Sequence, residues 1–192
     1  MTTDDESSSG ESVLSVSDSA RPVSGVTDPG PFSAETGGID LFGVLFDPTA
    51  TGWATDVSEY AGRIDRFGVV TGHDDVSAGL SALPDSLRES ATTVSAEGPR
   101  SLGEIGIRVS ETLSEGGDVR NSRLVFVDGF EQVLADTSLQ TTFRFLHILV
   151  ESTAFTDAVL HVSLDPEGCD ARAVETVAEL FDTVIDERAQ SL

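Results

Sequence analysis

Lysine is absent from this chain. All eleven basic side chains among its 192 residues are arginine. The absence excludes reactions and binding modes that need a primary ammonium group: Schiff-base catalysis, the phosphate-binding lysine of a P-loop, and the lysine of a phosphorelay receiver.

Positive charge is scarce as well. The eleven arginines stand against 34 acidic residues, which gives a formal net charge of −23 at pH 7. Nucleic acids and anionic membranes bind proteins through clustered cationic side chains. We therefore expect no nucleic acid and no membrane as a direct partner.

Cysteine and long apolar runs are equally rare. The single cysteine, Cys169, has no second cysteine for an internal disulfide, which is typical of a reducing compartment. The longest apolar stretches, such as 41–46 and 145–150, are far shorter than the ~20 residues that cross a bilayer. The first ten residues are acidic and lack the apolar core of a secretory signal. These features favour a cytoplasmic protein.

The acidic composition has two explanations. In extreme halophiles, hydrated carboxylates keep proteins soluble, and molar salt shortens the Debye length to ~3 Å, which suppresses self-repulsion. The alternative is an acidic regulator from a mesophile. Acidic residues occur along the whole chain while lysine is missing, and this combination favours the halophile.

Residues 1–38 are predicted to form a disordered acidic tail. They are rich in Ser, Thr, Asp, Glu, Gly and Pro, with only isolated apolar residues such as Val13, Leu14 and Val16. Such a segment buries too little surface to offset the entropy lost on ordering. The alternative for residues 12–16 is a short docking motif.

Residues 39–192 are predicted to form a single α/β domain. Apolar runs typical of buried strands occur at 41–48, 66–72, 92–96, 123–130 and 158–166. Between and after them, helical spacing of apolar residues predicts helices at 53–65, 101–116, 139–153 and 170–189. Alternating strands and helices indicate a mostly parallel sheet between two helical layers, a three-layer sandwich.

Three of the predicted strands end in an aspartate: Asp47, Asp128 and Asp165. Because parallel strands present their carboxyl ends at one edge of the sheet, the three carboxylates are candidates for a Mg²⁺ site. The alternative is that Asp-Pro and Asp-Gly simply form turns.

The run LVFVDGF at 124–130, placed after a helix with a capping-box sequence and before an amphipathic one, resembles the RecA/KaiC-like branch of P-loop ATPases. The resemblance makes Asp128 the aspartate that supports Mg²⁺. It also implies that the strand ending in Asp165 lies between those ending in Asp47 and Asp128. The stretches SLGEIGIRVSETL, FRFLHIL and LHVSLDPEGCDARAVETVAELFD resemble, more specifically, degenerate KaiC-like or GvpD-like proteins of haloarchaea, of unknown function.

The stretch DPTATGWA, 47–54, stands where the resemblance implies a phosphate loop. A functional loop reads G-x-x-x-x-G-K-[ST], and here only its second glycine, Gly52, is present. Trp53 occupies the lysine position, and Asp47 replaces the first glycine. Losing the charged lysine contact alone costs ~1.5–3 kcal/mol. The sequence therefore predicts a pseudo-ATPase that is not an enzyme and needs no cofactor.

These observations leave two main hypotheses. The first is a non-catalytic RecA/KaiC-like regulatory or signalling module that acts through a protein partner. The alternative is a nucleotide- or Mg²⁺-binding NTPase-like enzyme that uses the strand-end aspartates with Mg²⁺ and ATP. A third, a hydrolase with an aspartate nucleophile, lacks the usual x-D-x-D spacing. Self-association as a homo-oligomer is also open, because helix 139–153 is apolar on more than one face; the alternative is that it is buried against the sheet.

Overall fold

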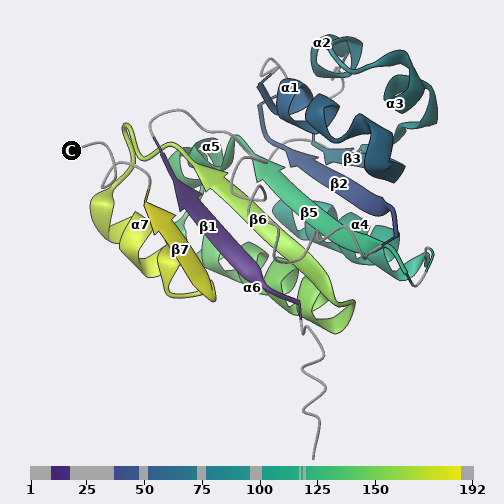
Figure 1. Ribbon diagram of the computed structural model, residues 1–192. Coiled ribbons are helices and arrows are strands. Elements are labelled where there is room, and N and C mark those ends of the chain that lie inside the picture. Colours follow the sequence, from purple (N-terminus) through teal and green to yellow (C-terminus); the bar gives the residue numbers. More distant parts are fainter. Residues whose placement is uncertain are drawn as a thin grey trace, which may run out of the picture.

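The computed structural model describes residues 10–17, 37–47, 52–72, 77–95, 101–116, 118 and 120–186. Within them, seven strands form one parallel sheet in the order β4-β3-β2-β5-β6-β1-β7 (Figure 1). The strands are β1 Ser12–Val16, β2 Ile39–Leu45, β3 Ile64–Thr71, β4 Thr92–Ser95, β5 Ser122–Asp128, β6 Ala158–Leu164 and β7 Thr183–Asp186. The helices are α1 Gly52–Glu59, the short η2 Ala61–Arg63, α2 Ser77–Ser81, α3 Asp85–Ser90, α4 Leu102–Ser114, α5 Phe130–Asp136, α6 Leu139–Phe155 and α7 Ala171–Ala178. The predicted three-layer α/β sandwich is confirmed.

Helices cover both faces of the sheet and create two hydrophobic cores. Successive residues of a strand point to opposite faces, so Val125 and Val127 join the core beneath α4, α5, α6 and α7, here called the α6 face. Leu124 and Phe126 join the core beneath α1 and α3, the α1 face. Strands buried on both faces read as continuous apolar runs, which is why β2 and β5 are recognisable in the sequence.

The predicted disordered tail is wrong for residues 10–17. Residues Ser12–Val16 form β1, which lies between β6 and β7 and pairs with both in parallel. Leu14 is fully buried and Val16 nearly so. The ordered domain therefore begins by residue 10 rather than at residue 39, while residues 1–9 and 18–36 of the predicted tail lie outside the described part of the chain.

The polar residues of β1 find partners that its composition does not reveal. The backbone N–H and the hydroxyl of Ser12 both donate to the Asp182 carboxylate, at 2.9 and 2.7 Å. Ser15 is hydrogen-bonded to His161 on β6, with 2.8 Å between Oγ and Nε2. Each buried hydroxyl is thus satisfied, so the serines do not oppose burial of the strand.

The predicted helix 170–189 is also wrong in its second half. Helix α7 ends at Ala178, and Thr183–Asp186 form the edge strand β7. Three of the four residues of β7 are β-branched, a composition that favours a strand. The helical spacing of Val184 and Ile185 is therefore coincidental, because β1 offers these residues a partner strand.

The capping box predicted for α4 does not form. Ser101 is the N-cap residue, but its hydroxyl donates to the Glu104 carboxylate at 3.2 Å and does not cap a backbone N–H. After the helix, Gly116 has a φ of 72°, in the left-handed region that glycine adopts without strain and in which helices commonly end.

We expect Leu14→Ala to lower the free energy of unfolding by about 3 kcal/mol, because it leaves a cavity in the core against β1, a strand that is paired on both sides. Denaturant unfolding in molar KCl, followed by circular dichroism, measures the loss. Val184→Ala is the matched control, since Val184 pairs with Leu14 on β7 but is 47% exposed; its loss should stay within about 0.5 kcal/mol. Equal, negligible losses would show that residues 12–16 do not stabilise the fold.

Candidate functional site: the acidic carboxyl edge

Three neighbouring strands bring the predicted aspartates to one edge of the sheet. Asp47 follows β2, Asp128 is the last residue of β5, and Asp165 follows β6. Strand β5 lies between β2 and β6, so Asp128 is the middle member. The expected order, with the Asp165 strand in the middle, is therefore wrong.

Asp128 is fixed by a tight junction between β5 and β2. Its carbonyl accepts a hydrogen bond of 2.9 Å from the backbone N–H of Phe46. Gly129, the N-cap of α5, has a φ of 74° and a ψ of 27°. A Cβ atom there would lie 2.8 Å from the backbone nitrogen of Asp47. Both the left-handed conformation and the close approach require glycine, so the Asp-Gly pair sets where the Asp128 side chain can lie.

The Asp128 carboxyl group is buried among like charges. Its residue is 5% exposed. Its pKa is raised from 3.8 to about 7, mainly by burial and also by the charges of Glu131, Asp47 and Asp56. Within the described residues, Oδ2 of Asp128 has no hydrogen-bond partner. A buried carboxyl group without a compensating cation favours its neutral form, so Asp128 holds a proton near neutral pH.

Glu131 extends this acidic cluster, which we define as Asp47, Asp56, Asp128, Glu131 and Asp165. Burial raises the pKa of Glu131; backbone hydrogen bonds lower it, and the charges of Asp165 and Asp47 raise it further. Among the described residues, no arginine forms an ion pair with Asp128, Glu131 or Asp165. The charges of these three carboxyl groups are therefore balanced by protons or by solutes rather than by arginine side chains of the described segments.

The predicted metal site is not assembled by the side chains as they stand. No group of three or more His, Cys, Asp or Glu residues in the described segments is arranged to hold a metal ion. Asp47, Asp128 and Asp165 share an edge, but Asp165 accepts a hydrogen bond of 2.8 Å from the backbone N–H of Glu167. That bond is the Asx turn expected of a turn-forming aspartate.

Cys169 lies beside the cluster. Burial raises the pKa of its thiol, and the charges of Glu131 and Asp165 raise it further. Its Sγ donates to the carbonyl of Asp165 at 3.5 Å. Because the thiolate is the reactive form of cysteine, these surroundings oppose thiol catalysis, in agreement with the sequence, which offers Cys169 no local His partner or second cysteine.

The predicted phosphate-loop positions have other roles. Trp53 is 1% exposed and packs between Phe67 and Phe126, with ring centroids 6.2 and 6.0 Å away. It is a core residue, not a substitute for lysine in a binding loop. Gly52 is exposed at the start of α1, and a Cβ atom there would meet nothing within 4 Å. Residues 48–51 of the same stretch lie outside the described segments.

A buried Ser-His pair is the polar feature that sequence reasoning missed. His161 is 1% exposed, as expected for a core histidine, and its partner Ser15 is 4% exposed. Ser15 belongs to the segment predicted as a tail, so no local pattern linked the two. The parallel register of β1 and β6 brings them together.

We expect the free energy of unfolding to fall as the pH rises from about 4 to about 7. The folded chain holds the Asp128 proton up to a pKa of about 7, whereas the ordinary value is 3.8. The stabilisation from this proton is therefore complete when the pH is below the ordinary pKa, and it is lost as the pH rises through the pKa of the folded state. The free energy of unfolding falls by at most about 1.4 kcal/mol per pH unit for one group. Asp128→Asn should flatten the slope and be more stable than the parent at pH 8, as measured by denaturant unfolding.

Asp136→Asn is the control, because Asp136 is an exposed aspartate at the end of α5, the helix that follows Asp128. It should keep the pH slope of the parent chain. A slope that is the same in all three proteins would contradict a buried, protonated Asp128.

Comparison with known proteins identifies a family for almost the whole chain. The model of DUF7504, described as a family of unknown function, matches residues 10–187. This range includes both β1 and β7. No curated protein and no solved structure gives a significant match. Among the described residues, no helix is both long and apolar enough to span a bilayer. The chain belongs to the family of unknown function DUF7504.

Proposed function

We propose that this chain is a non-catalytic α/β module, RecA/KaiC-like in architecture, that regulates or signals through contact with a protein partner, a second copy of the chain included. The observation that carries this proposal is the charge of the carboxyl edge, where nucleotides bind in open parallel sheets. The acidic cluster would repel the phosphates of a nucleotide. Asp128, Glu131 and Asp165 have no arginine partner in the described segments that could offset this repulsion.

The strand order gives the proposal a second support. In the topology that the resemblance implies, one strand lies between the phosphate-loop strand and the strand of Asp128. Strand β6 lies between β1 and β5, so β1, not β2, fits the position of the phosphate-loop strand. The sequence after β1, SDSARPVSG at 17–25, has one glycine and no lysine. It differs from a phosphate-binding loop as clearly as 47–54 does.

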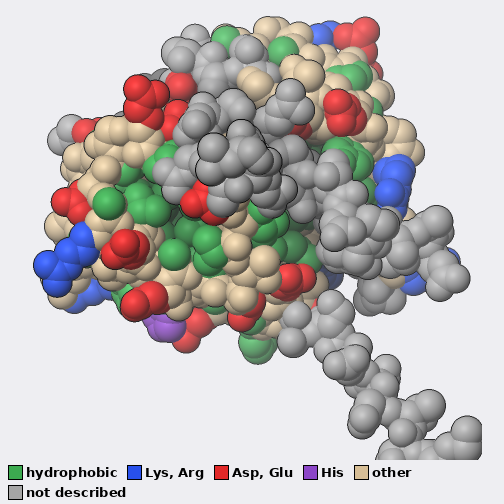
Figure 2. All heavy atoms as spheres, turned by 60° about the vertical axis from the view of Figure 1, so that its left-hand side comes forward, with side chains coloured by type: hydrophobic (Ala, Val, Ile, Leu, Met, Phe, Trp, Pro, Cys, Tyr) green, Lys and Arg blue, Asp and Glu red, His purple; other side chains and the backbone are tan. Residues whose placement is uncertain are grey.

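The setting that we propose is the cytoplasm of a halophilic archaeon. Acidic side chains are spread over the face seen in Figure 2 rather than collected in one patch, and basic ones are few. A dispersed acidic surface suits solubility in molar salt, whereas a single acidic patch would suit one basic partner.

A specific observation favours the alternative function. A carboxyl group such as that of Asp128, buried, unpaired at Oδ2 and with a pKa near 7, is the kind of group that serves in acid–base catalysis or binds a cation. Under this alternative, Asp47, Asp128 and Asp165 would bind Mg²⁺ and a nucleotide once the side chains rearrange.

Calorimetric titration of the full chain with Mg-ATP and Mg-GTP in molar KCl separates the two functions. We expect no saturable heat with either nucleotide, because no lysine is present and the edge is acidic. Titration with MgCl₂ alone is the matching control for a cation site without nucleotide.

Micromolar binding of either nucleotide that disappears in Asp128→Ala, but persists in the exposed Asp136→Asn, would overturn the non-catalytic proposal and support the enzyme. Binding of Mg²⁺ alone with the same dependence on Asp128 would support a cation site and leave the nucleotide function rejected.

A further inference from the structure

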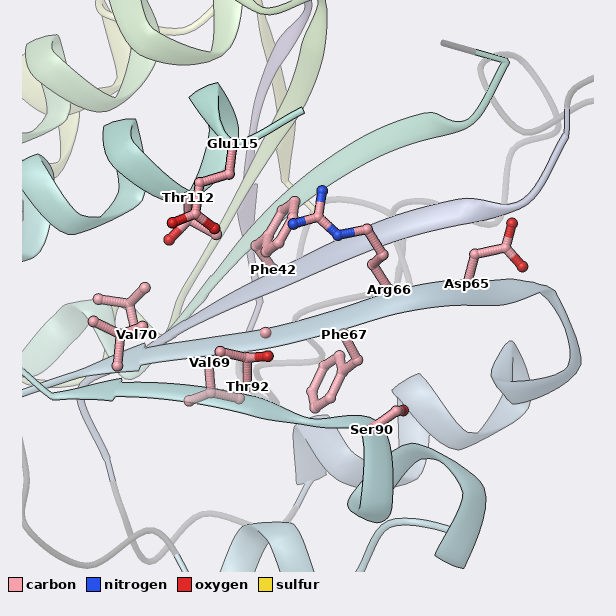
Figure 3. A pocket seen from close by; sticks show the side chains of 12 residues that line it. Phe42, Asp65, Arg66, Phe67, Val69, Val70, Ser90, Thr92, Thr112 and Glu115 are labelled. Atoms are coloured by element: carbon pink, nitrogen blue, oxygen red, sulfur yellow. The ribbon is translucent and has the colours of Figure 1, made fainter. Parts of the chain in front are cut away.

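A cavity of about 190 Å³ lies on the α6 face, between strands β2, β3 and β4 and the C-terminal end of α4 (Figure 3). Its lining includes no member of the acidic cluster. Phe42, Gly68, Val70 and Val94 supply its apolar wall. Its charged residues are Asp65 and Arg66 on β3 and Glu115 after α4. The cavity is therefore a separate site, with an apolar body and a charged rim.

The cavity exists because β3 has a glycine at its centre. Gly68 pairs with Phe42 on β2 and with Thr92 on β4. A Cβ atom at Gly68 would lie 3.0 Å from the Phe42 ring. A branched side chain at this position would occupy the space that is now open, so Gly68 offers a direct way to close the cavity.

Arg66 is held in one orientation at the rim. Its Nη1 lies 3.7 Å from the Asp40 carboxylate, which is fully buried, and also donates to the carbonyl of Gly116. The guanidinium carbon lies 5.6 Å from the centroid of the Phe42 ring. Within the described segments, Nε and Nη2 of Arg66 make no hydrogen bond. These two nitrogens form the edge of a guanidinium that matches a carboxylate in a bidentate pair.

The acidic residues of the lining indicate which charged groups a ligand needs besides a carboxylate. Glu115, the residue that follows α4, places a carboxylate beside the cavity. The Asp65 carboxylate points away from Arg66 and accepts a hydrogen bond of 3.1 Å from the side chain of Asn121 (Figure 3). An anion alone would be attracted by Arg66 and repelled by Glu115, and a cation alone would meet the opposite balance. A ligand with one negative and one positive group can pair with both Arg66 and Glu115. The apolar wall favours a hydrocarbon part that lies between these charged groups and the sheet.

We propose that this cavity binds a free α-amino acid with an apolar side chain. Its carboxylate pairs with Nε and Nη2 of Arg66, its ammonium group with Glu115, and its side chain packs on Phe42, Val70 and Val94. The volume corresponds to roughly six water molecules, which suits a ligand of this size. The proposal is independent of the function of the carboxyl edge.

The test is calorimetric titration of the full chain in molar KCl with L-valine, L-leucine and L-phenylalanine. At least one should bind saturably. N-acetyl-leucine, which lacks the ammonium group, and leucinamide, which lacks the carboxylate, should each bind about tenfold more weakly than leucine or worse, because each loses a charge-assisted contact.

Three variants locate the binding. Gly68→Val should abolish it by filling the cavity, while Thr93→Val, on the opposite face of β4, should leave it unchanged. Glu115→Gln changes an exposed side chain and keeps the protein folded even if Gly68→Val does not; it should bring the affinities for leucine and N-acetyl-leucine together. Absence of saturable binding by all three amino acids, or binding that Glu115→Gln leaves unchanged, would overturn the proposal.

Discussion

The parallel pairing of β1 with β6 and β7 is the constraint on which this sheet depends. Among the described strands, β7 pairs only with β1, so that without β1 it has no neighbouring strand in this sheet. The double hydrogen bond between Ser12 and Asp182 joins the start of the domain to its end. Closing so long a loop carries an entropy cost that local contacts cannot offset early in folding. The half of the sheet that contains β1 and β7 is therefore complete only after nearly the whole chain has been synthesised.

The sequence predicts the parts of the fold that are buried on both faces. Strands β2, β5 and β6 each contain a run of apolar residues, and α6 carries an apolar stripe, so the existence and order of these elements follow from the sequence pattern. Strands β1 and β7 are short, and β1 contains serines whose partners lie more than a hundred residues away. The average composition of the first 38 residues does not reveal the five-residue strand β1. The helical spacing around Val184 predicts a helix where the structure has β7. Both errors concern elements that only a tertiary partner can stabilise.

The candidate site, too, could be predicted from the sequence only in part. The Asp-Gly ending of β5 marks Asp128 in the sequence, because a left-handed residue must follow it. What the sequence does not show is that β5 lies between β2 and β6. In that position, burial and then the charges of Glu131, Asp47 and Asp56 raise the pKa of Asp128. The sequence also does not show that Trp53 is a core residue. Comparison of eight residues with a loop pattern cannot reveal that the indole packs between Phe67 and Phe126. Charge and burial at a sheet edge are properties of strand order, which local sequence determines only weakly.

Trp53 is the single tryptophan of the chain, and its position makes it an optical reporter of a defined region. The indole lies on the α1 face, against β3 and β5, and a Cβ atom at Gly79 of α2 would lie only 2.6 Å from its ring. Its fluorescence therefore reports whether α1 and α2 remain packed on the sheet. Separation of β1 and β7 at the other end of the sheet leaves that environment unchanged, so an unfolding event that begins at those strands is invisible to tryptophan emission, although the backbone signal registers it.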